Sequence, residues 1–139
     1  MNVKIPVPIT DLRHLARQAI RHAHMKPGEI SLVVCDDAFI SKLNLDYRNR
    51  QGPTDVLSFA MREGDLGDTA DPVLGDIIIS MQTTERQARE NGKTVEEEFK
   101  LLFTHGVLHL LGYTHDHEED EREMNALTNT ILAGIEGNS

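Results

Sequence analysis

The sequence predicts an α+β domain in which a small mixed β-sheet packs with several helices. A few strand patterns are followed by consecutive helical patterns, which is the order typical of that fold class. The chain has 139 residues, a length that suits one domain and allows about two thirds of the unfolded surface to be buried. We therefore expect a single domain over residues 1–139.

The first part of the chain combines helical periodicity with one apolar run. β-Branched apolar residues bounded by Gly or Asp predict a buried strand, and apolar residues at helical spacing behind a Thr or Asp predict capped helices. Two prolines limit the first segment to an edge strand or an extended lead-in. The expected elements are this segment over 3–9, a helix from the cap Thr10 to about Met25, a strand over 30–35, and a helix from the cap Asp37 to Asn49.

The second part contains two further strands and three helices. A Gly- and Asp-rich loop separates the strands, and a capping box in which Thr94 and Glu97 satisfy each other's backbone amides begins a strongly apolar helix. The apolar face of that helix is broad enough to be buried on much of its circumference. The expected elements are strands over 56–59 and 76–80, the loop over 63–71, and helices over 84–90, between Thr94 and Gly112, and from Glu118.

The formal net charge of −9 argues against broad, non-specific coating of nucleic acid, because such binding depends on Lys and Arg neutralising phosphates. An anionic substrate must therefore be bound by local positive charge. Two groups of basic residues could supply it, although a solvated helix face explains the second group more simply. They are Lys42, Arg48 and Arg50 in mid-chain and the helical stripe Arg13, Arg17 and Arg21.

The single cysteine, Cys35, lies in an apolar run, so we expect a buried thiol, no internal disulfide and a reducing compartment. The start of the chain has no apolar core of signal-peptide length, and no apolar run reaches the roughly 18 residues of a membrane span. The sequence thus predicts a soluble, cytoplasmic protein.

Three histidines, His105, His109 and His115, are spaced so that they can surround one metal ion. The first two are four residues apart and share one face of a helix. Gly112 can end that helix in the left-handed conformation and turn the chain back, which delivers His115. His117 is an alternative third ligand. Ordinary core, surface and loop histidines are the other interpretation, but the helix-ending glycine favours a metal site.

Three neutral imidazoles suit Zn²⁺ and leave its fourth tetrahedral position for water or substrate, as in catalytic sites. They also accept Ni²⁺ or another divalent metal. The spacing is that of the metzincin proteases, except that Gly106 replaces the Glu that serves those enzymes as general base. Because glycine accepts no proton, a zincin-like helix can be present here without the usual peptide hydrolysis.

Two motifs resemble the YbeY endoribonucleases, a family of bacterial ribosomal RNA maturation factors. The first is HGVLHLLGY, which starts at His105 and is followed by His115. The second is LNLDYR over 43–48, which leads to PTDVLSF over 53–59. A weaker block lies at 74–77, so the resemblance covers roughly residues 43–127.

The resemblance implies a zinc-dependent, single-strand-specific endoribonuclease that matures the 3′ end of 16S ribosomal RNA and acts in ribosome quality control. It places the metal ligands on His105, His109 and His115 and the functional arginine on Arg48. It also implies partners, namely the small ribosomal subunit and assembly factors that include a ribosomal protein and a GTPase. The chain departs from the family at Thr114, where an Asp is usual.

Arg48 suits phosphodiester cleavage, because negative charge develops on the non-bridging oxygens and a guanidinium binds such oxygens in a bidentate manner. A zinc ion with three neutral ligands keeps its double charge and polarises a phosphoryl oxygen. A surface salt bridge from Arg48 to Asp46 or Asp55 is the structural alternative. Few aromatic residues are available for base stacking, and the candidates, each of which can equally belong to the core, are Tyr47, Phe59 and Tyr113.

Two rival functions remain open from the sequence. In a non-catalytic module, zinc would only stabilise a domain that contacts the ribosome or its assembly factors, and a fourth protein ligand such as His117 or Asp116 would favour this function. A zincin-like metallopeptidase is supported by the histidine spacing and opposed by Gly106. We expect the nuclease first, the module second and the peptidase third.

Overall fold

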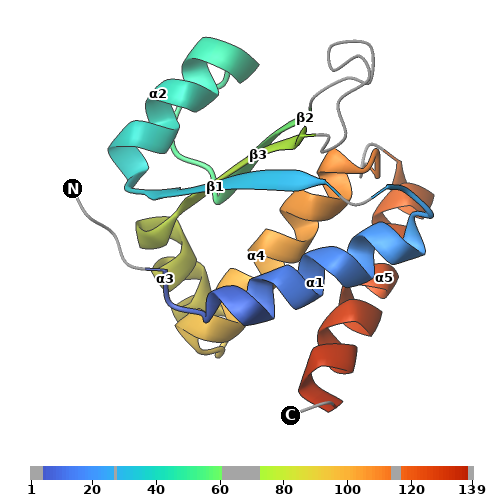
Figure 1. Cartoon of the computed structure of the whole chain (residues 1–139). Coiled ribbons are helices and arrows are strands. Elements are labelled where there is room, and N and C mark those ends of the chain that lie inside the picture. Colours follow the sequence, from blue (N-terminus) through green and yellow to red (C-terminus); the bar gives the residue numbers. More distant parts are fainter. Residues whose placement is uncertain (1–4, 27, 61–72, 114–116, 138–139) are drawn as a thin grey trace.

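The computed structural model describes residues 5–26, 28–60, 73–113 and 117–137. Within these residues it contains five helices and three strands, which confirms the α+β class (Figure 1). The expected loop over 63–71 lies outside the described residues. In chain order the elements are α1 (Ile9–His22), β1 (Glu29–Cys35), α2 (Asp37–Arg48), β2 (Val56–Ala60), β3 (Val73–Ser80), α3 (Met81–Glu90), α4 (Val95–Leu110) and α5 (Glu118–Gly137).

The strands form one mixed sheet in the order β1-β3-β2. β1 runs parallel to β3, and β2 runs antiparallel to it. The central strand is buried on both faces, since Ile77, Ile78 and Ile79 are at most 6% exposed. Side chains alternate across a strand, so Ile77 and Ile79 face the larger core while Ile78 faces the smaller one.

Helices cover both faces of the sheet (Figure 1). On one face α1, α4 and α5 build the larger core, in which Leu15, Phe99 and Leu108 are fully buried. α2 lies over the opposite face and covers a smaller core, formed by Cys35, Ile40, Leu57 and Ile78. α4 is the central helix, because it packs against two strands and three other helices. Side chains on α4 are therefore held by the whole fold.

The close packing of β3 against β2 and α4 requires a glycine at position 75. A Cβ there would collide with the carbonyl oxygen of Phe59 and would lie 2.7 Å from Cδ2 of Leu110. Gly75 also has a positive φ of 150° and sits at a register shift between β1 and β3. Its lack of a side chain lets the end of α4 lie directly against the sheet.

The expected cap of the first helix, Thr10, is wrong. α1 begins at Ile9 after Pro8, and no side chain caps its N-terminus. The proline has a preset backbone angle, and its carbonyl oxygen accepts the first amide hydrogen bonds of the helix. The helix also ends at His22, earlier than the expected Met25. Residues 5–8 form no strand, so the edge-strand alternative is wrong within the described part of that segment, which bends at Pro6 and Val7.

The expected cap Asp37 is also wrong, because Asp36 caps α2. The Asp36 carboxylate accepts a hydrogen bond from the backbone amide of Phe39 at 2.9 Å. Asp37 is the first helical residue, and its carboxylate joins α2 to α3. It accepts hydrogen bonds from Ser80 Oγ at 2.5 Å, Thr83 Oγ1 at 2.6 Å and Arg86 Nη1 at 3.2 Å. Because the Asp37 carboxylate accepts these hydrogen bonds from α3 and its cap, it is not available to cap α2.

The remaining elements agree with the sequence, apart from the starts of β3 and α3. β3 begins at Val73 rather than at 76, and α3 also begins early. That helix begins at Met81 rather than at 84, because the hydroxyl of Ser80 caps it. The capping box at the start of α4 is confirmed, with Thr94 and Glu97 exchanging hydrogen bonds of 2.9 Å and 3.1 Å. Cys35 is buried, as predicted, and burial together with the neighbouring carboxylates raises the pKa of its thiol to about 11. Among the described helices, none combines the length and apolar character needed to span a membrane.

Candidate functional site

α4 presents His105 and His109 along one partly open face, as the sequence predicts. Both histidines are half-buried, whereas the residues between and beside them, among them Thr104, Gly106 and Leu108, are buried. The Nε2 atom of His105 is shielded from solvent. A helix packed on most of its circumference keeps such side chains in fixed positions.

α4 ends at the predicted glycine. Gly112 has a φ of 101°, which is in the left-handed region. Its amide donates to the carbonyl oxygen of His109 at 3.1 Å, and the amide of Tyr113 donates to that of Leu108 at 3.0 Å. This pair of hydrogen bonds is the Schellman arrangement, in which the chain reverses after the last helical turn. The helix stop at Gly112 is therefore confirmed.

The ring of His109 is oriented by the turn that follows the helix. Its Nδ1 atom lies 3.1 Å from the carbonyl oxygen of Tyr113. A carbonyl oxygen only accepts, so the neutral ring carries its proton on Nδ1 and its lone pair on Nε2. Metal-binding histidines commonly donate their other N–H to a backbone carbonyl in this way. The state of His109 therefore fits a divalent metal ion.

The third predicted ligand, His115, lies outside the described residues, as do Thr114 and Asp116. Within the ranges that are described, no three His, Cys, Asp or Glu side chains form a group that could hold a metal ion. His117 is described and exposed, and its carbonyl oxygen accepts the amide of Glu121 at 3.0 Å. The three-histidine site stays a prediction.

Arg48 is the last residue of α2, and two neighbours on β2 hold its guanidinium. Nη2 donates to the carbonyl oxygen of Ser58 at 2.6 Å. The guanidinium carbon lies 5.5 Å from the centroid of the Phe59 ring, which is a cation–π contact. Among the described residues Arg48 makes no ion pair with Asp46 or Asp55, so the salt-bridge alternative is wrong.

Ser58 connects Arg48 to the histidine helix. Its carbonyl oxygen accepts from Arg48, and its Oγ donates to the carbonyl oxygen of Gly106 at 3.1 Å. Gly106 directly follows His105, so a single residue of β2 links the guanidinium to the part of α4 that carries the histidines. Sequence reasoning missed Ser58. The available signal was that Ser58 is the polar residue within the apolar run 56–59.

Gly106 allows α4 to pack closely on the sheet. A Cβ at this position would lie 3.0 Å from Cγ2 of Ile77 and 3.3 Å from Oγ of Ser58. A glutamate at position 106 would therefore have to enter space that these side chains fill. A side chain at this position would be directed at the sheet, which gives a structural reason for the glycine that the sequence singled out.

The three candidate aromatic residues have different environments. Tyr47 is 68% exposed, which excludes a core role for it. Its ring meets that of Phe59 edge to face, with centroids 5.5 Å apart and planes at 70°. Phe59 packs against the smaller core, and Tyr113 packs against the larger one. Of the three, Tyr47 offers its ring to solvent.

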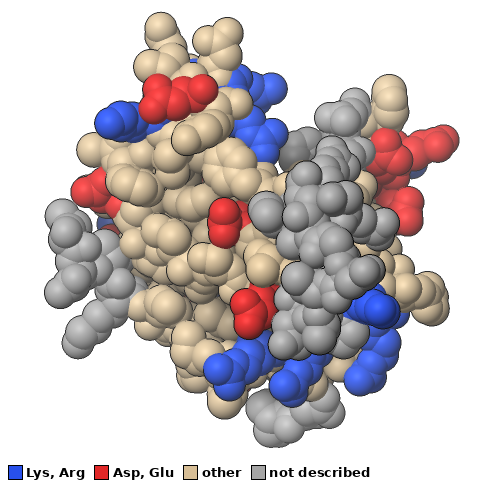
Figure 2. Space-filling view, turned by 45° about the horizontal axis from the view of Figure 1, so that its top comes forward, with Lys and Arg blue, Asp and Glu red and all other residues tan. Residues whose placement is uncertain are grey.

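The surface charge is mixed on the face shown in Figure 2. Lys and Arg gather toward two ends of this face, and acidic side chains lie between and beside them. The stripe Arg13, Arg17 and Arg21 on α1 is exposed, as expected of a solvated helix face. Arg48 is a cation that Ser58 links to the histidine helix.

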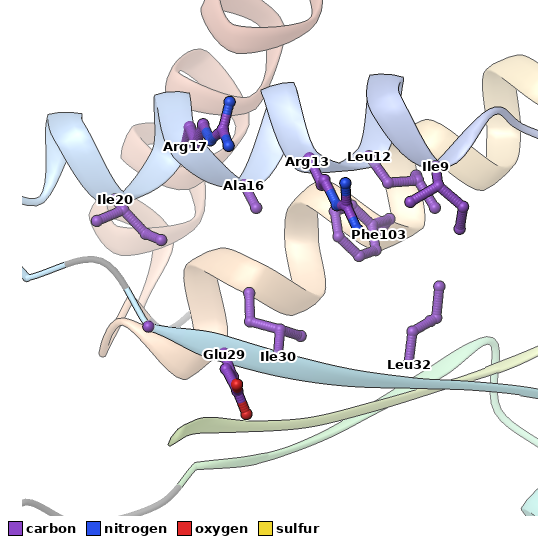
Figure 3. Close-up of a pocket in the computed structure, with 11 residues that line it drawn as sticks. Ile9, Leu12, Arg13, Ala16, Arg17, Ile20, Glu29, Ile30, Leu32 and Phe103 are labelled. Atoms are coloured by element: carbon purple, nitrogen blue, oxygen red, sulfur yellow. The ribbon is translucent and has the colours of Figure 1, made fainter. Parts of the chain in front are cut away.

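A cavity of about 560 Å³ lies between α1 and β1 (Figure 3). Ile30 and Leu32 point into it from the strand, and Ala16 and Ile20 face them from the helix. Arg48, His105 and His109 do not line this cavity. Arg13, Arg17 and Glu29 also line the cavity, which is thus separate from Arg48 and from the histidine pair.

Comparisons with known proteins cover nearly the whole chain. A family model described as "Endoribonuclease YbeY" matches residues 2–136. A protein named endoribonuclease YbeY from Heliobacterium modesticaldum is 55% identical over 117 residues, which are 78% of this chain and 70% of that protein. Another of the same name, from Pelotomaculum thermopropionicum, is 43% identical over 137 residues, or 96% and 90% of the two chains. The solution structure of TM1509 from Thermotoga maritima has a TM-score of 0.63 and 25% identity, and the match covers 94% of this chain and 82% of that one.

Proposed function

Because the chain belongs to the endoribonuclease YbeY family, and is thus a hydrolase that acts on RNA, we propose that it cleaves single-stranded RNA at a metal centre. His105, His109 and His115 hold the metal, and Arg48 binds the phosphoryl group that is attacked. One observation carries this proposal: Ser58 is hydrogen-bonded both to Arg48 and to the backbone carbonyl of Gly106, the residue after His105. The two electrophilic parts of the site are therefore fixed relative to each other.

The donor set suits a divalent cation. His109 has its lone pair on Nε2, because its Nδ1 donates to Tyr113. His105 lies one turn earlier on the same face, and His115 completes the set by the family motif. Three imidazoles favour Zn²⁺ and also accept Ni²⁺ or another divalent metal. When bound, the ion supplies a Lewis acid for a phosphoryl oxygen.

Arg48 retains donors for a phosphate. A guanidinium carries five N–H groups, and the bond to Ser58 uses one nitrogen. The remaining N–H groups can donate to two non-bridging oxygens, whose negative charge increases in the transition state. Because Ser58 and Phe59 already hold the guanidinium, less side-chain entropy is lost when the phosphate binds.

The cellular role proposed here follows from the family. The substrate is ribosomal RNA, processed at the 3′ end of the 16S molecule and during ribosome quality control. The partners are the small ribosomal subunit and its assembly factors, and the compartment is the cytoplasm. Family membership supports these assignments, and the mixed surface charge agrees with them, because partner proteins rather than a broad basic surface would then bring the enzyme to its RNA.

The proposal is tested by cleavage assays on matched substrates. The purified protein is incubated with a labelled single-stranded RNA, with the same RNA in a duplex, and with casein, before and after chelation. We expect cleavage of the single strand alone, its loss on chelation, and its return when Zn²⁺ is added. His109→Ala should abolish cleavage, whereas His22→Ala, which changes an exposed histidine of α1, should not.

The rival functions give different results. Hydrolysis of casein would identify a peptidase. Zinc bound without any cleavage of RNA, alone or in the small ribosomal subunit, would identify the non-catalytic module. RNA cleavage that survives complete removal of metal would contradict the metal centre itself.

A further inference from the structure

Tyr47 is a large aromatic residue that the fold leaves uncovered. Its side chain is 68% exposed, although it lies in the last turn of α2 directly before Arg48. An exposed aromatic ring has much apolar surface that a ligand can cover. Neither the core nor the phosphate contact of Arg48 explains the ring, so another role has to be considered.

The ring is held in place by its neighbour. Phe59 meets Tyr47 edge to face at 5.5 Å between centroids, and the same Phe59 ring lies 5.5 Å from the guanidinium carbon of Arg48. Phe59 itself is packed against the smaller core. It therefore acts as a fixed support whose own ring is occupied, while Tyr47 keeps most of its surface free.

Such an arrangement suits the binding of one flat ligand. A supported aromatic ring loses little conformational freedom when a second ring stacks on it. Every nucleobase has a π-face, and stacking on an aromatic side chain is a common way of binding single-stranded nucleic acid. The adjacent Arg48 would then lie beside the phosphate of the same strand.

We propose that Tyr47 is a stacking site for one unpaired nucleobase of the RNA, next to the phosphate contact at Arg48. This inference rests on the proposed function, since it assumes that RNA is the substrate. It also explains single-strand preference, because a base inside a duplex is covered by its neighbours and cannot present a face to Tyr47. The site is expected to bind any of the four bases, since stacking on an aromatic ring does not depend on the identity of the base.

The test measures binding separately from cleavage. A single-stranded RNA that carries one 2-aminopurine is mixed with the metal-loaded protein in a stopped-flow instrument, and the fluorescence change on binding is recorded before cleavage begins. Tyr47→Ala should weaken binding by about fivefold or more, the lower end of base–aromatic stacking. Tyr47→Phe keeps the ring and should bind like the wild type. In steady-state assays KM should rise for Tyr47→Ala while kcat changes little.

A matched control separates stacking from the loss of any exposed aromatic residue. Phe39 is also on α2 and is 49% exposed, and Phe39→Ala should leave RNA binding unchanged. Wild-type RNA affinity in Tyr47→Ala would overturn the proposal. If the wild type itself neither binds nor cleaves single-stranded RNA, that result contradicts the proposed function as a whole and not only the role of Tyr47.

Discussion

Arg48 depends on two residues of β2 for its position. Ser58 accepts a hydrogen bond of 2.6 Å from it, and Phe59 supports its guanidinium plane at 5.5 Å. Ser58 also donates to Gly106, on the helix that carries the histidines. At the level of single residues, one serine therefore links the guanidinium of Arg48 to the backbone of the helix that carries His105 and His109.

Replacing Arg48 should separate catalysis from metal binding. Arg48→Ala removes the bidentate donor for the phosphoryl oxygens and is expected to lower kcat/KM on single-stranded RNA by roughly a hundredfold. Arg48→Lys keeps the charge without the planar fork and should restore only part of that loss. Metal content, measured by atomic absorption, should stay unchanged in both variants.

The control for Arg48 is Arg89→Ala, which removes an exposed arginine of α3. It should cleave RNA at the wild-type rate and should have the wild-type metal content. A wild-type cleavage rate in Arg48→Ala would contradict the role given to Arg48.

Local sequence patterns predicted the histidine helix, but they could not predict contacts between residues that are distant in the sequence. The pair His105 and His109 and the stop at Gly112 depend on helical spacing and on a left-handed glycine, which are properties of neighbouring residues. The partners of Arg48 come from a different element, so the sequence alone offered only a salt bridge to nearby Asp residues as the structural alternative and did not indicate Ser58 or Phe59. The exposure of Tyr47 could not be predicted either, because helical periodicity also placed it on an apolar face.

At the scale of elements, Asp37 joins the starts of α2 and α3. Burial raises the pKa of this carboxyl, but hydrogen bonds from Ser80, Thr83 and Arg86 outweigh it and hold the pKa below its ordinary value of 3.8. A group whose pKa is lower in the folded state stabilises the fold above its unfolded pKa. That contribution to stability is lost as the pH falls through the pKa that Asp37 has in the folded protein.

Asp37→Asn should therefore destabilise the protein in a pH-dependent way. At pH 7 we expect the free energy of unfolding to fall by about 1.5–3 kcal/mol, the value of one hydrogen bond to a charged group. The difference between wild type and variant should narrow as the pH drops below 3.8, because the wild type then loses the same contribution. Urea denaturation at several pH values measures both. A difference that is constant or grows in acid would argue against this role of Asp37.

The close packing of β3 against β2 and α4 at Gly75 allows a second prediction, which concerns the stability of the fold. Gly75→Ala places a methyl group against the backbone of β2 and should cost at least about 2 kcal/mol in urea denaturation. Gly134→Ala is the matched control, since nothing lies within 4 Å of a Cβ at this position of α5. It should stabilise the protein by about 0.5–1 kcal/mol, because alanine favours a helix. Equal stability of the two variants would contradict the close packing at Gly75.

Element types were predictable because periodicity and capping are local, whereas helix starts depended on contacts between elements. Asp37 looked like a cap in the sequence, yet its carboxylate is used by Ser80 and Thr83, and Asp36 caps α2 instead. Pro8 starts α1 without any side-chain cap. The capping box of Thr94 and Glu97 was predicted correctly, because both partners belong to the same helical turn.

At the scale of the whole molecule, the histidine helix is also the centre of the core. α4 packs between the sheet and the other helices, and its apolar residues Phe99, Val107 and Leu108 are fully buried. The strand order β1-β3-β2 produces this arrangement, and no local pattern in the sequence predicts such an order. The α+β class could be predicted, but the layer on which each helix lies could not.

Because α4 is stabilised by its burial in the core, we expect the protein to stay folded when the metal is removed. Chelation should abolish RNA cleavage while far-UV circular dichroism and cooperative urea unfolding persist, because burial of α4 supplies its stability. Bound ion should add only the stabilisation expected from ligand binding. Unfolding on chelation would instead identify the ion as a structural element and would support the non-catalytic module.

The proposed metal centre requires that His105, His109 and His115 together hold one divalent ion with a position left open. An anomalous difference map at the zinc absorption edge, from crystals grown with Zn²⁺, tests it most directly. We predict a single peak bonded to one ring nitrogen of each histidine, with the remaining position facing solvent. Histidine rings directed away from one another, or a fourth protein ligand on the ion, would contradict the claim.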